Sequence, residues 1–317
     1  MARPHIEPYV ELNDPYRRFD IAGFKGSHYK VLSLDTDTGA CTLKVRFDGG
    51  YKRKPGLSYS DIEFFLLTGT MQVGKETWRE GHYAFLPAGT ALGEIRVSQG
   101  AEALVMYNDS EPSFEESSRH HPLVMSDAFV SLNSYDDRPW GPGGIVSPSV
   151  ASGCMIKILH YDPITEACSF LYCMVPRFGQ DNISYHDSAE EAYHIWGTSW
   201  MMQFGELPTG GYFYRPPYIN HGAFQCKLGT LAIGRTDSQL YNHFHFNPWT
   251  NIEENRERAA SRIQQWKPDL YKWINQQGHN HPVDFEYAHG HAHGDMAHHH
   301  GDGQVEHAHK KKRRSRR

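Results

Sequence analysis

Short runs of β-branched and aromatic residues, in which apolar and polar positions alternate, recur along the chain as far as about residue 240. Gly, Pro and Asp residues separate these runs at intervals of about 8 to 12 residues, which is typical of barrels and sandwiches. Helical spacing of apolar residues is nearly absent before the segment 251–275. The pattern therefore predicts an all-β body followed by a C-terminal helix over residues 251–277. We expect the principal strands at 41–47, 62–69, 82–87, 101–107, 168–175, 190–197 and 230–236.

The β pattern forms an internal repeat, with two copies along the chain. Residues 29–41 (YKVLSLDTDTGAC) align with residues 156–168 (IKILHYDPITEAC) at an offset of 127. The offset drifts only to 129 over the later pairs, which are Gly69 with Gly197, Gly81 with Gly210 and Pro87 with Pro216. We therefore expect two domains of the same fold, at residues 1–120 and 121–250, with the Pro-, Gly-, Ser- and Asp-rich segment 109–150 crossing between them.

Residue types that bind metals occur at matched positions in the second copy only. The first copy has Ser60, Ile62, Leu66 and Leu92 where the second copy has His186, Glu190, His194 and His221. The first copy thus fills the same interior with apolar side chains, as a small barrel does when it holds no ligand. The comparison predicts one lost site and one working site.

Strand alternation places the charged group of this set in a barrel interior. Glu190, Ala192, His194 and Trp196 share one face of the strand expected at 190–197. A buried carboxylate costs several kcal/mol unless it has a partner, and a metal ion held with His186 and His221 is one such partner. Two imidazoles and one carboxylate with open positions favour Fe(II) and similar divalent ions.

Other interpretations of these residues remain open from the sequence. Glu190 could instead pair with Arg215 or Arg235, and the two histidines could be ordinary loop or turn residues. His194 could be a further ligand, a proton donor and acceptor, or a residue that supports the ligands. Simple barrel core is the plainest interpretation for four other residues, Trp196, Trp200, Met201 and Met202.

Both copies resemble the cupin superfamily, whose two motifs run G-x5-H-x-H-x3/4-E-x6-G and G-x5-P-x-G-x2-H-x3-N. The stretch SYHDSAEEAYHIWG follows the first motif from His186 through Glu190 to Gly197, and GGYFYRPPYINH follows the second from Gly210 through Pro216 to His221. The resemblance spans roughly residues 25–245. It implies an all-β bicupin, with two double-stranded β-helix barrels in tandem and metal ligands His186, Glu190 and His221 in the second.

The chain departs from the family motifs at three positions. Ser184 stands in place of the first histidine of the H-x-H pair, Tyr218 in place of the glycine of P-x-G, and Gln225 in place of the final asparagine. Four-ligand cupins such as oxalate decarboxylases and germins are therefore poorer guides to this site than members with two histidines and one glutamate.

The resemblance implies a metal-dependent dioxygenase acting on a small aromatic or enolisable substrate. Gentisate dioxygenases and the large subunit of hydroquinone dioxygenases share this layout, and the expected metal is Fe(II), with Mn, Zn or Ni as alternatives. We expect Tyr185 and Arg215 to bind the substrate and His194 and Tyr218 to move protons. Two other classes of function stay open: a redox-neutral lyase, isomerase or decarboxylase that uses the metal to polarise a carbonyl, and a non-catalytic binding module.

Composition and charge limit the binding partners and the cellular compartment that we expect for the protein. The net charge is −5, and much of the basic excess sits in the terminal KKKRRSRR, so we expect no nucleic-acid surface on the folded part. No apolar run has the length of a membrane span. Five cysteines without C-x-x-C spacing suggest free thiols in the cytoplasm. We expect a homodimer, with a partner subunit left open, and a disordered tail over 278–317, which holds ten of the 21 histidines.

Overall fold

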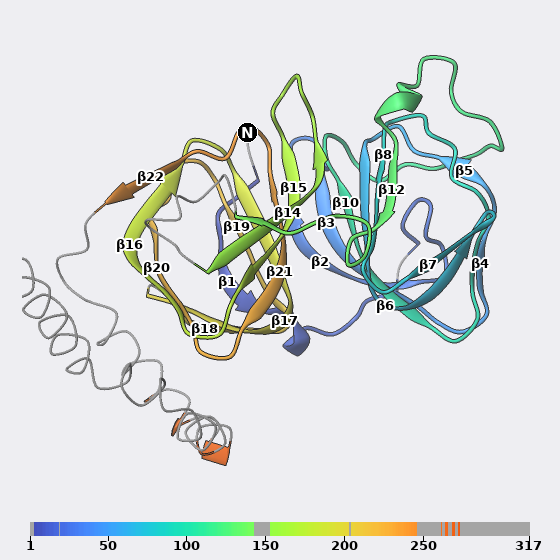
Figure 1. The fold of residues 1–317 in the computed structure, drawn as a ribbon. Coiled ribbons are helices and arrows are strands. Elements are labelled where there is room, and N and C mark those ends of the chain that lie inside the picture. Colours follow the sequence, from blue (N-terminus) through green and yellow to red (C-terminus); the bar gives the residue numbers. More distant parts are fainter. Residues whose placement is uncertain are drawn as a thin grey trace, which may run out of the picture. The chain divides into compact units, whose positions relative to one another are not determined.

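The computed structural model describes residues 3–18, 20–142, 153–202 and 204–245, together with the single positions 261, 264, 265, 268, 269 and 272. Residues Met1–Asn247 form one compact unit and Pro248–Arg317 form a second. The first unit is almost entirely β and consists of two curled sheets (Figure 1). The expected all-β fold is therefore confirmed.

The first curled sheet takes its strands from the first copy of the repeat. Its hydrogen-bonded order is β12-β8-β6-β10-β3-β2, and three further strands pair beside this path. A separate pair, β11 (Glu115–Glu116) with β5 (Gly56–Leu57), lies outside the sheet. The strands of the sheet are β2 (His28–Leu34), β3 (Cys41–Phe47), β4 (Tyr51–Arg53), β6 (Ile62–Val73), β7 (Glu76–Arg79), β8 (His82–Leu86), β9 (Ile95–Val97), β10 (Ala101–Tyr107) and β12 (Val130–Asn133).

The second curled sheet repeats this plan and carries the candidate site. Its order is β13-β14-β15-β21-β17-β20-β16-β22, with β1, β18 and β19 beside the path. Two short 3₁₀ turns, η1 (Glu11–Asn13) and η2 (Ser126–Ala128), lie outside the sheets. The strands are β1 (Ile6–Val10), β13 (Gly141–Pro142), β14 (Cys154–Tyr161), β15 (Cys168–Met174), β16 (Phe178–His186), β17 (Glu190–Met201), β18 (Gly205–Pro208), β19 (Gly211–Arg215), β20 (His221–Cys226), β21 (Thr230–Thr236) and β22 (Asn242–His245).

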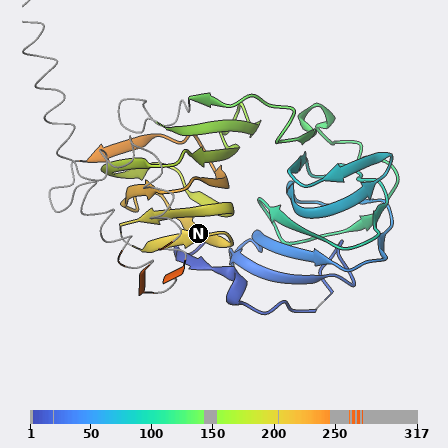
Figure 2. The same ribbon diagram turned by 60° about the horizontal axis from the view of Figure 1, so that its bottom comes forward.

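The two sheets exchange strands, so they do not divide where the repeat suggested. β1 precedes the first copy but pairs with β19 of the second sheet, where Tyr9 lies opposite Tyr212. Figure 2 shows the dark blue β1 beside the yellow strands of that sheet. In the same way β12, which follows residue 120, pairs with β8 of the first sheet, with Leu132 opposite Tyr83. Each exchanged strand covers an edge that would otherwise leave backbone groups unpaired.

A buried polar network joins the two sheets with approximate twofold symmetry. Thr42 of the first sheet donates a hydrogen bond to Glu191 of the second at 2.8 Å, and Ser169 of the second donates to Glu63 of the first. Arg235 forms ion pairs with both carboxylates, at 3.1 Å to Glu63 and 2.8 Å to Glu191. Because buried carboxylates need partners from the other sheet, the two halves stabilise each other.

The interiors of the two barrels differ as the residue comparison predicted. The first barrel holds a continuous apolar cluster that includes Phe64, Leu66 and Trp78. Apolar side chains in the second barrel form smaller separate clusters, for example around Met201 and Phe213. The second interior is therefore free to accommodate polar side chains.

The expectation that Trp196 lies in the core is wrong, because its side chain is 59% exposed. The pairing of β17 with β21 shifts register between His194 and Trp196, which is a β-bulge. A bulge inserts one extra residue and reverses the alternation beyond it. The same shift separates Leu66 from Thr68 in β6, so both copies bend their long strand at the same place. Trp200 and Met201 are buried as expected.

The structure describes only six positions of the two C-terminal segments, the helix expected at 251–277 and the tail at 278–317. The six described positions between 261 and 272 are all helical and exposed, and they include Pro268. The rest of the helix expected at 251–277 and the whole tail at 278–317 lie outside the described residues. Among the described residues, no helix has the length and apolar character needed to cross a membrane.

Candidate metal centre

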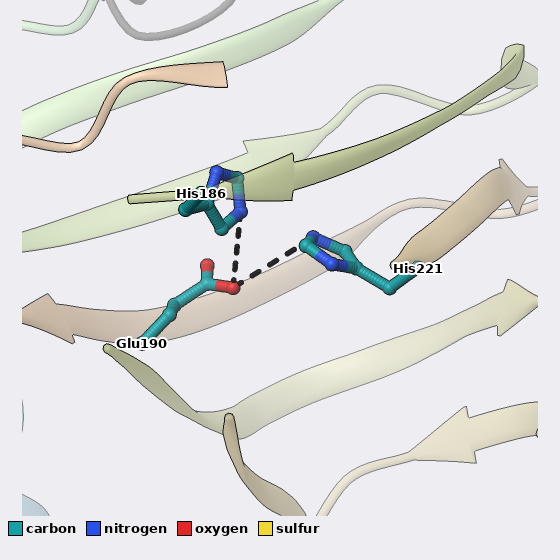
Figure 3. Close-up of side chains that lie close together, drawn as sticks. All are labelled: His186, Glu190 and His221. Carbon is teal, nitrogen blue, oxygen red and sulfur yellow. Dashed lines mark ion pairs between the residues drawn. The ribbon is translucent and has the colours of Figure 1, made fainter. Parts of the chain in front are cut away.

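His186, Glu190 and His221 lie close together in the second barrel, on three different strands (Figure 3). His186 ends β16, Glu190 begins β17 and His221 begins β20. The ligand atoms of the three side chains all lie within 4.8 Å of one another. Oε2 of Glu190 is 3.5 Å from Nε2 of His186 and 3.9 Å from Nε2 of His221. The structure thus brings together the three residues that the sequence singled out as metal ligands.

Strand pairing explains why residues so far apart in the sequence meet here. Ser184 of β16 lies opposite His221, the first residue of β20. His186 follows Ser184 by two residues, so it lies on the same face of β16, next to His221. The backbone N–H of Tyr218 donates to the carbonyl of His186 at 2.8 Å, so the turn before His221 is fixed to the end of β16. Tyr218 has a positive φ of 67°, at the position where the cupin motif has glycine.

The electrostatic state of the cluster suits a divalent cation. Burial alone would raise the pKa of Glu190, but the hydrogen bond from His186 and the positive charges nearby lower it to about 2. Burial and the charge of Arg215 lower the pKa of His221 to about 3. At neutral pH, Glu190 is therefore ionised and His221 is neutral, which are the forms that bind metals.

The hydrogen bonds and distances of the cluster also fit a metal ion. Nδ1 of His221 donates to the carbonyl of Ile219 at 2.9 Å, which leaves Nε2 without a proton and free to act as a ligand. Nδ1 of His186 is buried and has no hydrogen-bond partner among the described residues. Ligand atoms bound at about 2.0 to 2.2 Å lie about 3 to 3.6 Å apart, and the separations of 3.5 Å and 3.9 Å between Glu190 and the two histidines are close to this range.

Arg215 is the competing partner for Glu190, and Arg235 is not. Nη1 of Arg215 lies 3.9 Å from Oε2 of Glu190, farther than His186 does. The guanidinium is buried and packs over the ring of Phe213, 4.1 Å from its centroid. Arg235 is engaged with the carboxylates between the two sheets. Arg215 is therefore a cation at the border of the cluster, and its distance from Glu190 is too long for a hydrogen-bonded ion pair.

His194 is buried but does not join the three-residue cluster. Its Nε2 lies 3.4 Å from the hydroxyl of Tyr172, and burial lowers the pKa of His194 to about 4. Tyr172 is a residue that the sequence reasoning missed. A signal existed, because Val45 stands at the matching position of the first copy at the offset of 127. Comparing the copies for all polar gains, not only for ligand types, would have found it.

Tyr185 and Tyr218 form an aromatic pair near the cluster. Their ring centroids are 6.0 Å apart, and the Tyr185 ring stacks on His243 at 4.7 Å. Nε2 of His243 in turn lies 2.9 Å from the carboxylate of Asp187. The Tyr218 ring is 67% exposed, so it faces solvent from the turn that is bonded to His186. The expected roles of these two tyrosines in substrate binding and proton transfer stay predictions.

Two curled sheets of this topology, one with a buried His-Glu-His cluster, define a protein of the cupin fold. The chain belongs to the family described as "Domain of unknown function (DUF4437)", whose profile matches residues 24–243. A search of curated proteins gave no match.

Solved structures show the same fold. A candidate dioxygenase from Nostoc punctiforme PCC 73102 is 21% identical, with a TM-score of 0.71 over 79% of this chain and 89% of its own. A single-substitution variant of oxalate decarboxylase from B. subtilis is 14% identical, with a TM-score of 0.50 over 75% of this chain and 78% of its own. At these identities the likeness shows the fold alone.

Proposed function

We propose that the chain is a bicupin enzyme that binds one divalent metal in its second barrel, and that it is a non-haem Fe(II) dioxygenase. The observation that carries the proposal is the buried convergence of His186, Glu190 and His221. Two imidazoles and one carboxylate leave about three positions of an octahedral ion for substrate and dioxygen. When bound, Fe(II) supplies one-electron redox chemistry with dioxygen. The first barrel lacks these ligands and supports the second through shared strands.

The residues around the ligands favour an anionic or enolisable substrate. Arg215 is buried with its Nη1 3.9 Å from Glu190, so it can attract a phenolate, enolate or carboxylate oxygen toward the metal. Tyr185 packs with Tyr218, whose exposed ring belongs to the turn that is bonded to His186, and this aromatic pair suits a small planar ring. We propose that Arg215 and Tyr185 bind the substrate.

His194 and Tyr172 form a buried pair that is neutral at pH 7, because burial lowers the pKa of His194 to about 4 and raises that of Tyr172. Nε2 of His194 lies 3.4 Å from the Tyr172 hydroxyl, and we propose that the neutral imidazole accepts a proton from a substrate more acidic than tyrosine. This pair also favours a second candidate function, a redox-neutral lyase, isomerase or decarboxylase in which protons move and no oxygen is consumed. An assay under strict anaerobiosis separates the two, because only the redox-neutral enzyme would turn over.

Metal content of the full chain, measured by ICP-MS after anaerobic purification, tests the metal site. We expect about one equivalent above the background of the His-rich tail, and Glu190→Ala or His186→Ala should lose most of it. His243→Ala is the matched control, because His243 lies near the cluster but outside it, and it should keep the metal. Full occupancy in Glu190→Ala would refute the proposed ligand set.

The identity of the metal and oxygen consumption test the proposed class of reaction. Near-stoichiometric iron, with oxygen uptake in the presence of catechols, hydroquinones or diketones, would support the dioxygenase. Manganese, zinc or nickel, with turnover in the absence of oxygen, would support the redox-neutral enzyme. Absence of metal even after reconstitution would leave a binding module.

A further inference from the structure

The first barrel keeps a small pocket at the position of the lost site. Ser60, Ile62 and Leu92, the counterparts of the three ligands, all line it. The free space is about 20 Å³, which is enough for roughly one water-sized group. The apolar replacements have therefore not filled this interior completely.

Arg53 of β4 lines the same pocket and is a cation without a counter-charge. Among the described residues, no carboxylate forms an ion pair with it, and its one hydrogen bond in this part of the chain runs from Nε to the carbonyl of Lys54 at 3.3 Å. Nη2 is buried and has no acceptor among the described residues. Burial also lowers the pKa of Arg53.

The groups that face Arg53 are aromatic or neutral. The guanidinium lies 5.0 Å from the ring centroid of Phe114 and 5.8 Å from that of Phe24. The hydroxyl of Thr90, another lining residue, is also buried and has no hydrogen-bond partner in the described structure. In the second barrel the comparable cation, Arg215, has Glu190 beside it. The first barrel has Leu86 at the position that matches Arg215, and its positive charge comes instead from Arg53 of β4, with no carboxylate beside it among the described residues.

From this arrangement we infer that the first barrel binds a small monovalent anion, held by Nη2 of Arg53 and the hydroxyl of Thr90. Arg53 is half-buried, but its Nη2 is buried without an acceptor, and an anion that accepts this hydrogen bond stabilises the cation. The inference is independent of the proposed function, because it uses no residue of the second barrel.

The size of the pocket limits the anion to a few atoms. The Phe114 ring lies against Gly56, where any side chain would collide with it, so the ring closes the pocket on that side. β11 follows Phe114 and pairs with β5, which fixes this cover in place. Chloride fits such a space and formate is at its upper limit, whereas benzoate does not fit unless Phe114 moves.

Anion titrations of the full chain test the site. Sodium formate, chloride or benzoate is titrated at constant ionic strength, with gluconate as the bulky balancing anion, and Tm is recorded by calorimetry. Binding is measured directly from the broadening of the ¹³C-formate and ³⁵Cl NMR signals. We expect a saturable rise in Tm and line broadening with formate, with chloride or with both, and no effect of benzoate. The formate and chloride titrations distinguish the two sources of the anion.

Variants connect the binding to Arg53. Arg53→Gln should abolish the saturable response, and Thr90→Val should weaken binding several-fold. Arg79→Gln is the control, because it removes an exposed positive charge from β7, and it should leave the response unchanged. The response should persist in Arg215→Gln, which removes the cation that could bind an anion in the second barrel. If Arg53→Gln fails to fold, Arg53→Lys should retain binding with lower affinity. No saturable response in the unaltered protein, or an unchanged one in Arg53→Gln, would overturn the inference.

Discussion

Single glycines lie inside the long strand of each barrel, just past its β-bulge. Gly197 and its counterpart Gly69 have φ values of 84° and 87°, in the left-handed region where side chains other than hydrogen are disfavoured. A Cβ atom at Gly197 would also collide with the carbonyl oxygen of Gly229, and one at Gly69 would collide with that of Gly100. The repeated glycines of the sequence are therefore structural requirements.

Gly197→Ala should destabilise the protein by about 3 kcal/mol, since the left-handed backbone costs about 1 kcal/mol and the steric collision adds about 2 kcal/mol. Urea denaturation followed by tryptophan fluorescence measures this. Gly50→Ala is the matched control, because Gly50 has a φ of 87° but open space around its Cβ position. It should cost only about 1 kcal/mol. Equal losses in the two variants would contradict the steric part of the argument.

At the scale of elements, the exchanged strand β1 is anchored by a buried charge cluster at its C-terminal end. Glu11 follows β1 directly and accepts hydrogen bonds from Lys30 at 2.6 Å, Lys44 at 2.8 Å and Tyr193 at 2.8 Å. The two lysines belong to the first sheet and the tyrosine belongs to the second. One carboxylate thus joins both sheets to the exchanged strand.

Glu11→Gln should cost about 3 to 5 kcal/mol at pH 7, because it leaves two buried ammonium groups without a counter-charge. Burial would raise the pKa of Glu11, but hydrogen bonds from Lys30 and Lys44 lower it below 4.5. A lowered carboxyl pKa stabilises the fold above the unfolded value and loses that effect as pH falls. The stability difference between the protein and Glu11→Gln should therefore shrink below about pH 4.5.

Chemical denaturation across a pH series measures this change. Glu116→Gln is the control, because the pair between Glu116 and Lys54 is exposed on both sides, and such pairs contribute little. A difference for Glu11→Gln that stays constant down to pH 3 would show that the Glu11 charge does not stabilise the fold.

At the scale of the molecule, exchanged strands and the shared carboxylates make the two barrels one folding unit. A mixed apolar cluster adds to this, since it contains Phe65 and Leu104 of the first sheet together with Leu171 and Ile233 of the second. Neither barrel would keep its edge covered or its buried charges paired if the other unfolded. Residues Met1–Asn247 accordingly form one compact unit.

We therefore expect one cooperative unfolding transition for this unit. Phe64→Ala, in the interior of the first barrel, should cost about 3 to 5 kcal/mol and lower the unfolding midpoint of both barrels together. Calorimetry tests this, combined with the fluorescence of Trp78 in the first barrel and of Trp200 in the second, each followed in a variant that lacks the other tryptophans. Two separate transitions, with only the first shifted by Phe64→Ala, would show that the barrels unfold independently.

Much of the fold was predictable because strand signals are local. The strands expected at 41–47, 101–107 and 230–236 match β3, β10 and β21, since alternation and turn residues act within a few positions. The clustering of His186, Glu190 and His221 was predictable for a different reason. The first copy served as an internal reference, so a histidine or glutamate that occurs only in the second copy could be recognised at its matched position.

Residues whose role depends on contacts distant in sequence were not predictable. Trp196 was misplaced because a bulge depends on how two strands pair, and Tyr172 was missed because its value lies in its distance to His194. The strand exchange was also hidden, since β1 has no copy-specific pattern to link it to β19.

By itself, the sequence determined the all-β class, the duplication and which three residues to propose as metal ligands, because these follow from local periodicity and from the comparison of two copies. The tertiary structure alone decided which edge each exchanged strand covers, which cations border Glu190, and where a charge was left without a partner. Those outcomes depend on distances between residues far apart in the chain, which local hydrophobic patterns do not encode.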